Sequence, residues 1–182
     1  MKKLIAILGV ALLSFTGSVN AQKLGHVNSQ EILKEVPGYA ASEKEMERYR
    51  NLKVTQLTDL QKNVQAAYDK YINDQPTLPE NIKKSREKEI QEMQLAAQQF
   101  EQKAQKQIEE KYLELMKPLT TQLNKAIKEV AKAGGYTYIL DVSQGNVLYY
   151  DGGEDVSAKI IAQLKKNAAT PQQAKPAPGA GN

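Results

Sequence analysis

The sequence contains no cysteine and no tryptophan, and it has a single histidine. The absence of cysteine excludes a disulfide framework and a thiolate metal site, so packing alone has to stabilise the fold. Aromatic residues make up 6% of the chain, which is too few for a thick globular core. An abundance of Gln, Lys, Glu and Ala favours long helices instead.

Long apolar stretches are also scarce, and the only one lies at the N-terminus. Two lysines precede an apolar stretch over residues 4–15, and Val19-Asn20-Ala21 places small side chains where signal peptidase reads them. We interpret residues 1–21 as a cleaved signal peptide, so the mature chain is exported and begins at Gln22. A membrane anchor is the alternative, but the stretch is shorter than the ~20 residues that span a bilayer. No cysteine follows the cleavage site, which excludes a lipoprotein anchor.

The charge of the mature chain is nearly balanced. The full sequence has 25 basic and 21 acidic residues, so loss of Lys2 and Lys3 leaves 23 basic residues and a formal charge of +2. This small excess argues against a nucleic-acid partner. One basic cluster stands out, and we interpret it as a solvated helix face. Its residues are Lys83, Lys84, Arg86 and Lys88.

Residues 39–117 are predicted to form a helical hairpin. Apolar residues recur there three or four positions apart, as in a coiled coil. Pro76 and Pro79 interrupt the pattern, so the chain is expected to reverse near residues 74–81. Each arm of ~35 residues at 1.5 Å per residue would extend ~50 Å, so the hairpin should protrude from the rest of the molecule. Pro118, inside the second helix, is expected to bend it and to act as a hinge where the arm meets a body.

Residues 22–38 and 118–166 are predicted to form a small β/α body. Three strands are expected, over residues 23–28, 136–142 and 147–150, and the last two are expected to form a hairpin. Asn28 should cap a brief helix over residues 31–36. Asp155 should cap a final helix that carries apolar residues on one face, and residues 167–182 should be a disordered tail. The apolar residues of the final helix are Val156, Ile160 and Leu164.

Three short strands form a sheet that is too small to be stable alone, so we expect the fold to depend on oligomerisation. We predict a mainly α protein, in which a coiled-coil arm protrudes from a short-stranded oligomerisation domain. Strands from several copies would bury the edges that one copy leaves open. The residues predicted to mediate oligomerisation are Val27, Ile139, Leu140, Val142 and Leu148.

The chemistry-bearing residues do not form a catalytic constellation. His26 lies in a predicted strand, where a packed or rim imidazole is the common arrangement, and the carboxylates alternate with lysines on helices. We therefore predict no enzyme activity, no metal site and no cofactor. Binding to other proteins is expected to use adaptable side chains at the edges of the apolar stripes. These candidates are Met46, Tyr49, Tyr68, Tyr71, Ile90, Met93 and Tyr112.

The order of several short motifs resembles the OmpH/Skp family of periplasmic chaperones. The motifs are GHVNSQEIL (25–33), PG (37–38), KPL (117–119), AIKEVA (126–131) and GGYTYILD (134–141), arranged around the long hairpin. The resemblance implies a periplasmic homotrimer with a small β body and three helical arms. It also implies that the arms enclose a cavity that holds unfolded outer-membrane proteins before insertion.

Two points qualify what the resemblance implies. The nearly balanced charge of the mature chain does not support carrying over lipopolysaccharide or acidic-lipid contact at the membrane periphery. An exported coiled-coil module that tethers cell-envelope components is the alternative function. A tether would have one stoichiometric partner and no general affinity for unfolded chains.

Overall fold

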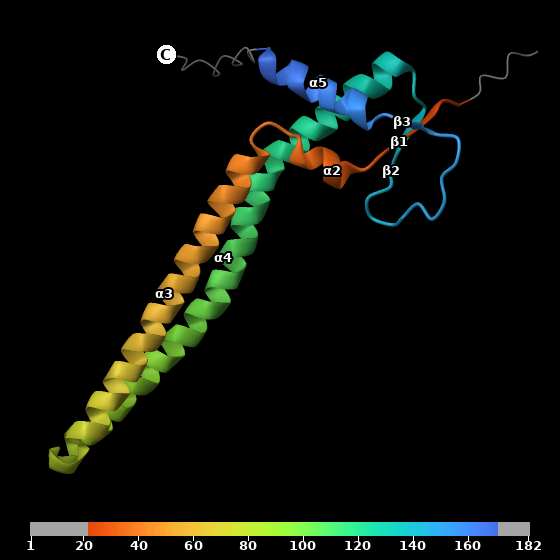
Figure 1. Ribbon diagram of the computed structural model, residues 1–182. Coiled ribbons are helices and arrows are strands. Elements are labelled where there is room, and N and C mark those ends of the chain that lie inside the picture. The colour runs from red at the N-terminus through yellow and green to blue at the C-terminus, as the bar shows by residue number, and fades with distance from the viewer. Residues whose placement is uncertain (1–21, 171–182) are drawn as a thin grey trace, which may run out of the picture.

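The structure, a computed structural model, describes residues 22–170 and consists of a small body and a long two-helix arm (Figure 1). The predicted signal peptide and residues 171–182 lie outside the described residues. The predicted class, mainly helical with a protruding hairpin and a small sheet, is confirmed. The elements are β1 (Leu24–Val27), α2 (Ser29–Lys34), α3 (Tyr39–Asp74), η2 (Gln75–Thr77), α4 (Glu80–Gly134), β2 (Tyr138–Asp141), β3 (Glu154–Asp155) and α5 (Ser157–Ala169).

Helices α3 and α4 run antiparallel along the arm and meet at η2. Pro76 lies at the start of this 3-10 turn, and Pro79 is the N-cap of α4, so the two prolines set the reversal. Ala97 and Ala104 are buried in α4, and such small side chains allow two helices to approach closely. Between residues 22 and 170 no helix combines the length and the apolar composition that a membrane span requires.

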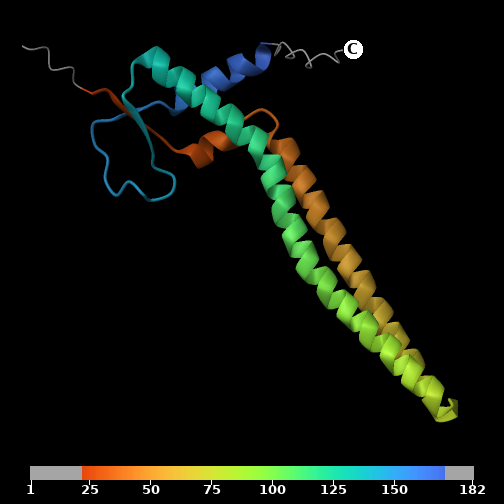
Figure 2. The same ribbon diagram turned by 180° about the vertical axis from the view of Figure 1, so that it is seen from behind.

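Helix α4 changes direction between the arm and the body (Figures 1 and 2). Pro118 lies within this helix and has no N–H to donate to the preceding turn. Two hydroxyls nearby bond backwards to the main chain: Thr120 Oγ1 lies 3.1 Å from the Met116 carbonyl oxygen, and Thr121 Oγ1 lies 2.8 Å from that of Lys117. Hydroxyl bonds of this kind favour bending, so three neighbouring residues promote a bend in the same turn.

The core of the body lies between α5, α2 and the C-terminal part of α4. Val156 and Ile160 are fully buried and Leu164 is 2% exposed, as the predicted apolar face requires. Helix α5 continues to Ala169, beyond the residue at which the disordered tail was predicted to begin. The side-chain amides of Gln163 and Asn167 donate to Glu129 Oε2 over 2.8 and 2.7 Å, which anchors this last turn on α4.

The sheet is parallel, in the order β2-β1-β3, with Leu24 opposite Tyr138 and Gly25 opposite Glu154. The predicted hairpin over residues 136–150 is therefore wrong, because residues 147–150 form no strand and β3 lies on the far side of β1. The chain has to travel back across the sheet to start β3 parallel to β1. The Tyr150 ring lies 4.7 Å from that of His26 in β1.

The two predicted caps of the body are present in modified form. The Glu31 N–H donates to Asn28 Oδ1 over 3.2 Å, so Asn28 caps α2, which begins at Ser29 and ends at Lys34. Asp155 Oδ1 accepts from the Ser157 N–H over 2.8 Å, although the residue at the cap position of α5 is Val156. Both side chains satisfy N–H groups that a helix start leaves unpaired.

Candidate functional site

Three of the seven residues predicted to bind other proteins are buried inside the arm. Met46 is 5% exposed, and Tyr71 and Ile90 are each 7% exposed. The Tyr71 hydroxyl donates to Glu87 Oε1 over 2.5 Å and joins α3 to α4, and this bond raises the pKa of Tyr71. These side chains hold the hairpin together, and their burial removes them from the surface that a partner can reach.

The other four predicted residues reach the surface to different degrees. Tyr68 and Tyr112 are 47% and 45% exposed, whereas Tyr49 and Met93 are half-buried. Lys53 Nζ lies 5.1 Å from the centre of the Tyr49 ring, so a cation covers part of that ring. Tyr68 and Tyr112 are therefore the predicted side chains most available for contact.

Sequence reasoning missed several exposed apolar residues of the arm. Val54 and Ile72 are 62% and 45% exposed, and their spacing of about five helical turns places them on one side of α3 together with Tyr68. Leu95 and Leu113, 53% and 59% exposed, have the same spacing on α4. We call Val54, Tyr68 and Ile72 the α3 stripe. The five-turn repeat in the sequence is the signal that could have revealed both sets.

A groove lies at the base of the arm, where α2, α3 and α4 meet. Its volume is about 610 Å³, and we call it the basal groove. The Tyr39 hydroxyl donates to Glu43 Oε1 over 2.9 Å at its wall, and this bond to a carboxylate raises the pKa of Tyr39. The groove thus combines apolar and aromatic surface with charged groups. Its lining residues are Leu33, Tyr39, Ala40, Glu43, Lys44, Met46, Glu47, Arg50, Asn51, Tyr112 and Met116.

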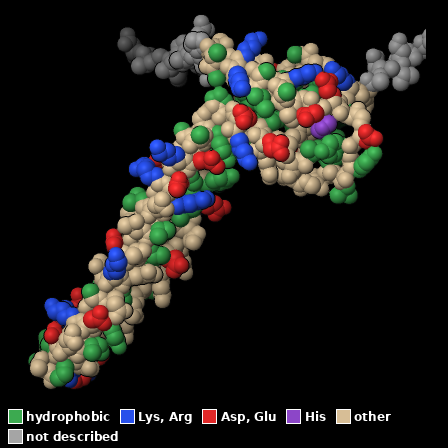
Figure 3. All heavy atoms as spheres, in the orientation of Figure 1, with side chains coloured by type: hydrophobic (Ala, Val, Ile, Leu, Met, Phe, Trp, Pro, Cys, Tyr) green, Lys and Arg blue, Asp and Glu red, His purple; other side chains and the backbone are tan. Residues whose placement is uncertain are grey.

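The sheet leaves one apolar face exposed. Leu24, Tyr138 and Leu140 are 44%, 55% and 39% exposed, and the loop after β2 adds Leu148, at 97%. Figure 3 shows hydrophobic side chains gathered beside the histidine on this part of the body. We call these four residues the outer sheet face. Exposed apolar side chains of this kind are typical of a protein interface.

The residues predicted to mediate oligomerisation are divided between this face and the interior. Leu140 and Leu148 belong to the outer sheet face, whereas Val27 is 2% exposed and lies in the core. Ile139 is half-buried and packs against the same core, and Val142 is half-buried as well. Burial of Val27 follows from the strand period of two, which places it on the opposite face of β1 from Leu24.

His26 lies in β1, where its ring is held by packing contacts. Its Nδ1 atom is buried without a hydrogen bond, and its ring contacts that of Tyr150. Among residues 22–170, no group of three or more His, Asp or Glu side chains could hold a metal ion.

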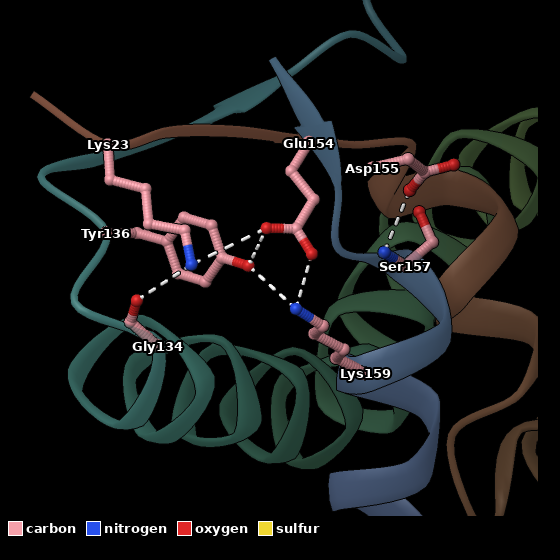
Figure 4. A network of polar contacts seen from close by, with 7 residues as sticks. All are labelled: Lys23, Gly134, Tyr136, Glu154, Asp155, Ser157 and Lys159. Atoms are coloured by element: carbon pink, nitrogen blue, oxygen red, sulfur yellow. Dashed lines mark hydrogen bonds and ion pairs between the residues drawn. The ribbon is translucent and has the colours of Figure 1, made fainter.

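A polar cluster joins Lys23, the residue before β1, to the C-terminal elements of the body (Figure 4). Lys23 Nζ donates to the Gly134 carbonyl over 3.0 Å and lies 4.1 Å from the centre of the Tyr136 ring. Glu154 Oε2 accepts from the Tyr136 hydroxyl over 2.5 Å, and Glu154 Oε1 pairs with Lys159. The cluster therefore connects β1, β3, α5 and the end of α4.

This cluster predicts a specific response to acid. Hydrogen bonds from Lys159 and Tyr136 lower the pKa of Glu154 from 4.5 to about 2. Its stabilising effect is thus complete above pH 4.5 and is lost as the pH falls toward 2. As the pH is lowered from 4.5 toward 2, the urea concentration at the midpoint of unfolding should therefore fall less steeply for Glu154→Gln than for wild type. Glu109→Gln, an exposed change on the arm, is the control, and parallel curves for wild type and Glu154→Gln would contradict the assignment.

Comparisons with known proteins agree with this architecture. The family model described as outer membrane protein (OmpH-like) matches residues 23–164. The chaperone protein Skp of Yersinia pestis is 30% identical over 167 residues, which is 91% of this chain and 100% of that protein. Skp of Yersinia enterocolitica is 28% identical over the same shares of the two chains. A crystal structure of an OmpH-like protein from Caulobacter crescentus has a TM-score of 0.69 at 16% identity, covering 85% of this chain and 92% of that one, and it supports the fold.

Proposed function

Because the chain belongs to the OmpH-like outer membrane protein family, we propose that it is a periplasmic holding chaperone for unfolded outer-membrane proteins. The Skp relatives are chaperones by name, and they align over nine-tenths of this chain. In this function the chain holds its unfolded clients between helical arms, prevents their aggregation and uses no ATP. Release follows when membrane insertion competes for the client.

The observation that carries the proposal is the apolar surface that the arm leaves open to solvent. The α3 stripe, together with Leu95 and Leu113, distributes apolar contacts along the arm without concentrating them in one pocket. Separate weak contacts suit an unfolded client, because each of them can be exchanged as the client moves. Tyr68 and Tyr112 fit this role because a tyrosine ring offers both an apolar face and a polar hydroxyl.

Assembly into a homotrimer is part of the same proposal. The outer sheet face supplies apolar surface at the body, and another copy of the chain is the partner that would cover it. Three arms held side by side would then act on one client, and avidity would make the total binding tight while each contact stays weak. Leu140 and Leu148 are the predicted interface residues that are exposed for this purpose.

We further propose that Pro118 is a hinge that lets the arms spread around clients of different size. In Pro118→Ala the helical hydrogen bond to the Glu114 carbonyl can form, so the arm should become straighter and stiffer. The variant should show a narrower distribution of distances between spin labels at the arm tips, and it should bind large clients less well than small ones. An unchanged spread and client range would exclude the hinge.

The experiment that tests the proposed function compares unrelated clients. Several urea-unfolded β-barrel proteins are diluted into buffer with and without the mature chain, and their turbidity is recorded. A holding chaperone should suppress the aggregation of all of them. The alternative function, an exported tether of cell-envelope components, predicts one stoichiometric partner and no protection of unrelated unfolded chains. Protection of no client would reject the chaperone proposal.

A further inference from the structure

The β2–β3 loop, residues 142–153, is attached to the sheet at His26. The Tyr150 ring lies 4.7 Å from the His26 ring, with an angle of 46° between the two planes. Gly153 lies so close that a Cβ atom on it would be 3.3 Å from His26 Nδ1. The Nδ1 atom is buried, and it has no hydrogen-bond partner among residues 22–170. The loop therefore covers the single imidazole of the chain by packing, without a hydrogen bond to Nδ1.

The middle of this loop is held less firmly than its end. Figure 1 shows the loop leaving the sheet in a wide curve between β2 and β3. Leu148 and Tyr149 in this curve are 97% and 79% exposed, whereas Tyr150 is 49% exposed. Gly145 and Gly152 bound the curve with positive φ angles of 69° and 86°. Segments with few buried side chains open at a low cost in free energy, so the contact with the imidazole has a large share in keeping the loop closed.

Protonation of the imidazole changes this contact. Neutral imidazole can carry its proton on Nε2 and leave Nδ1 bare, whereas imidazolium has an N–H group at both positions. The protonated ring would thus have a buried Nδ1–H group without an acceptor, which is unfavourable for a charged donor. The Tyr150 ring attracts a cation more weakly than the water that Nδ1–H would reach if the loop opened. Imidazole is also the side chain whose charge ordinarily changes between pH 5 and 8.

The charged groups near His26 do not remove this effect. Asp155 of β3 is the register partner of His26, and hydrogen bonds from Ser157 lower the pKa of Asp155, so it stays a carboxylate above pH 5. Asp155 belongs to the sheet and attracts the imidazolium whether the loop is open or closed. Asp151 of the loop is exposed, and water weakens its attraction for a nearby cation. Leu140, the register partner in β2, carries no charge.

We propose that His26 is a pH sensor, which holds the β2–β3 loop against the sheet when its imidazole is neutral and releases the loop when it is protonated. Leu148 is carried by this loop and is one of the four residues of the outer sheet face. Its position on that face therefore depends on the protonation of His26. Mild acid would rearrange the outer sheet face without unfolding the rest of the body.

The absence of tryptophan makes a direct test possible. Tyr150→Trp in the full mature chain places a single indole ring against the imidazole, and quenching of its fluorescence by acrylamide reports how exposed that ring is. Acrylamide is uncharged, so the charge of the protein does not change its access. We expect the quenching constant to rise about twofold from pH 8 to pH 5, because a half-exposed ring becomes fully exposed when the loop opens.

His26→Gln in the Tyr150→Trp chain is the control, because glutamine keeps a polar side chain at this position and does not titrate. Its quenching constant should be the same at both pH values. A rise of equal size in this control, or no rise in the chain that keeps the histidine, would overturn the proposal. Mass is recorded by light scattering at both pH values. A rise that occurs only together with a change in mass would also overturn the proposal, because it would report the separation of copies.

A second variant tests the packing against Nδ1 without changing the titrating group. In Gly153→Ala the added Cβ atom would meet His26 Nδ1 at 3.3 Å, which is closer than ordinary van der Waals contact. The loop should then be displaced at any pH, so Tyr150→Trp combined with Gly153→Ala should show the high quenching constant already at pH 8. A constant as low as that of Tyr150→Trp alone would show that the loop is not seated on Nδ1 and would overturn the proposal.

Discussion

Leu140→Asp is expected to separate the proposed homotrimer into single folded chains. Leu140 lies on the outer sheet face and is 39% exposed in the single chain, so aspartate at this position can remain hydrated when the chain is alone. In an assembled body the same carboxylate would be buried without a partner, which costs several kcal/mol. The mass measured by light scattering should fall to that of one chain, while the helical circular dichroism signal stays unchanged.

Loss of assembly should also abolish client retention. A single arm makes only the weak contacts of its own surface, and avidity between linked sites is worth a factor of about 10² to 10⁴. Leu52→Asp is the matched control, because it makes the same change at a leucine of the arm that is 48% exposed and lies outside the proposed client-binding surface. This control should keep its mass. If Leu140→Asp also stays assembled, the outer sheet face is not the interface.

Removing the apolar side chains of the α3 stripe is expected to weaken client binding about tenfold to a hundredfold. Each of the three contacts should contribute roughly 0.5–1 kcal/mol, which is less than the value for full burial because the contacts are partial and exchangeable. The variant is Val54→Ser, Tyr68→Ser and Ile72→Ser. Serine has a helix propensity close to that of the residues it replaces, and all three side chains are exposed, so the arm should remain folded.

The affinity for a fluorescently labelled unfolded β-barrel protein is the measurement for this variant. Leu52→Ser is the control, since Leu52 is 48% exposed on α3 but lies outside the stripe. A loss that is equally large in Leu52→Ser would mean that the whole apolar surface of the arm matters and the stripe does not. Wild-type affinity in the triple variant would mean that clients bind elsewhere.

The parts of the fold that could be predicted from sequence are those set by local patterns. The hairpin follows from apolar residues three and four positions apart, and its reversal follows from Pro76 and Pro79. The buried face of α5 was predicted correctly because Val156, Ile160 and Leu164 share one side of a helix whatever they pack against. Periodicity of this kind needs no knowledge of distant residues.

The errors arose where distant segments decide the structure. The composition of residues 147–150 favours a strand, but β3 on the far side of β1 requires the chain to cross the sheet at this point. Similarly, whether an arm residue packs inward depends on the path of the other helix. Tyr71 lies at the edge of its apolar stripe, yet Glu87 of α4 draws it into the hairpin through a hydrogen bond.

The most direct test of the account is the mass of the mature protein measured by light scattering, alone and after a urea-unfolded β-barrel protein is diluted into it. We expect a particle of three chains that takes up the client as a soluble complex, with no rise in turbidity. An oligomer that leaves the client to precipitate would contradict the chaperone function. A single chain that keeps the client soluble would contradict the shared body and the avidity that the account requires.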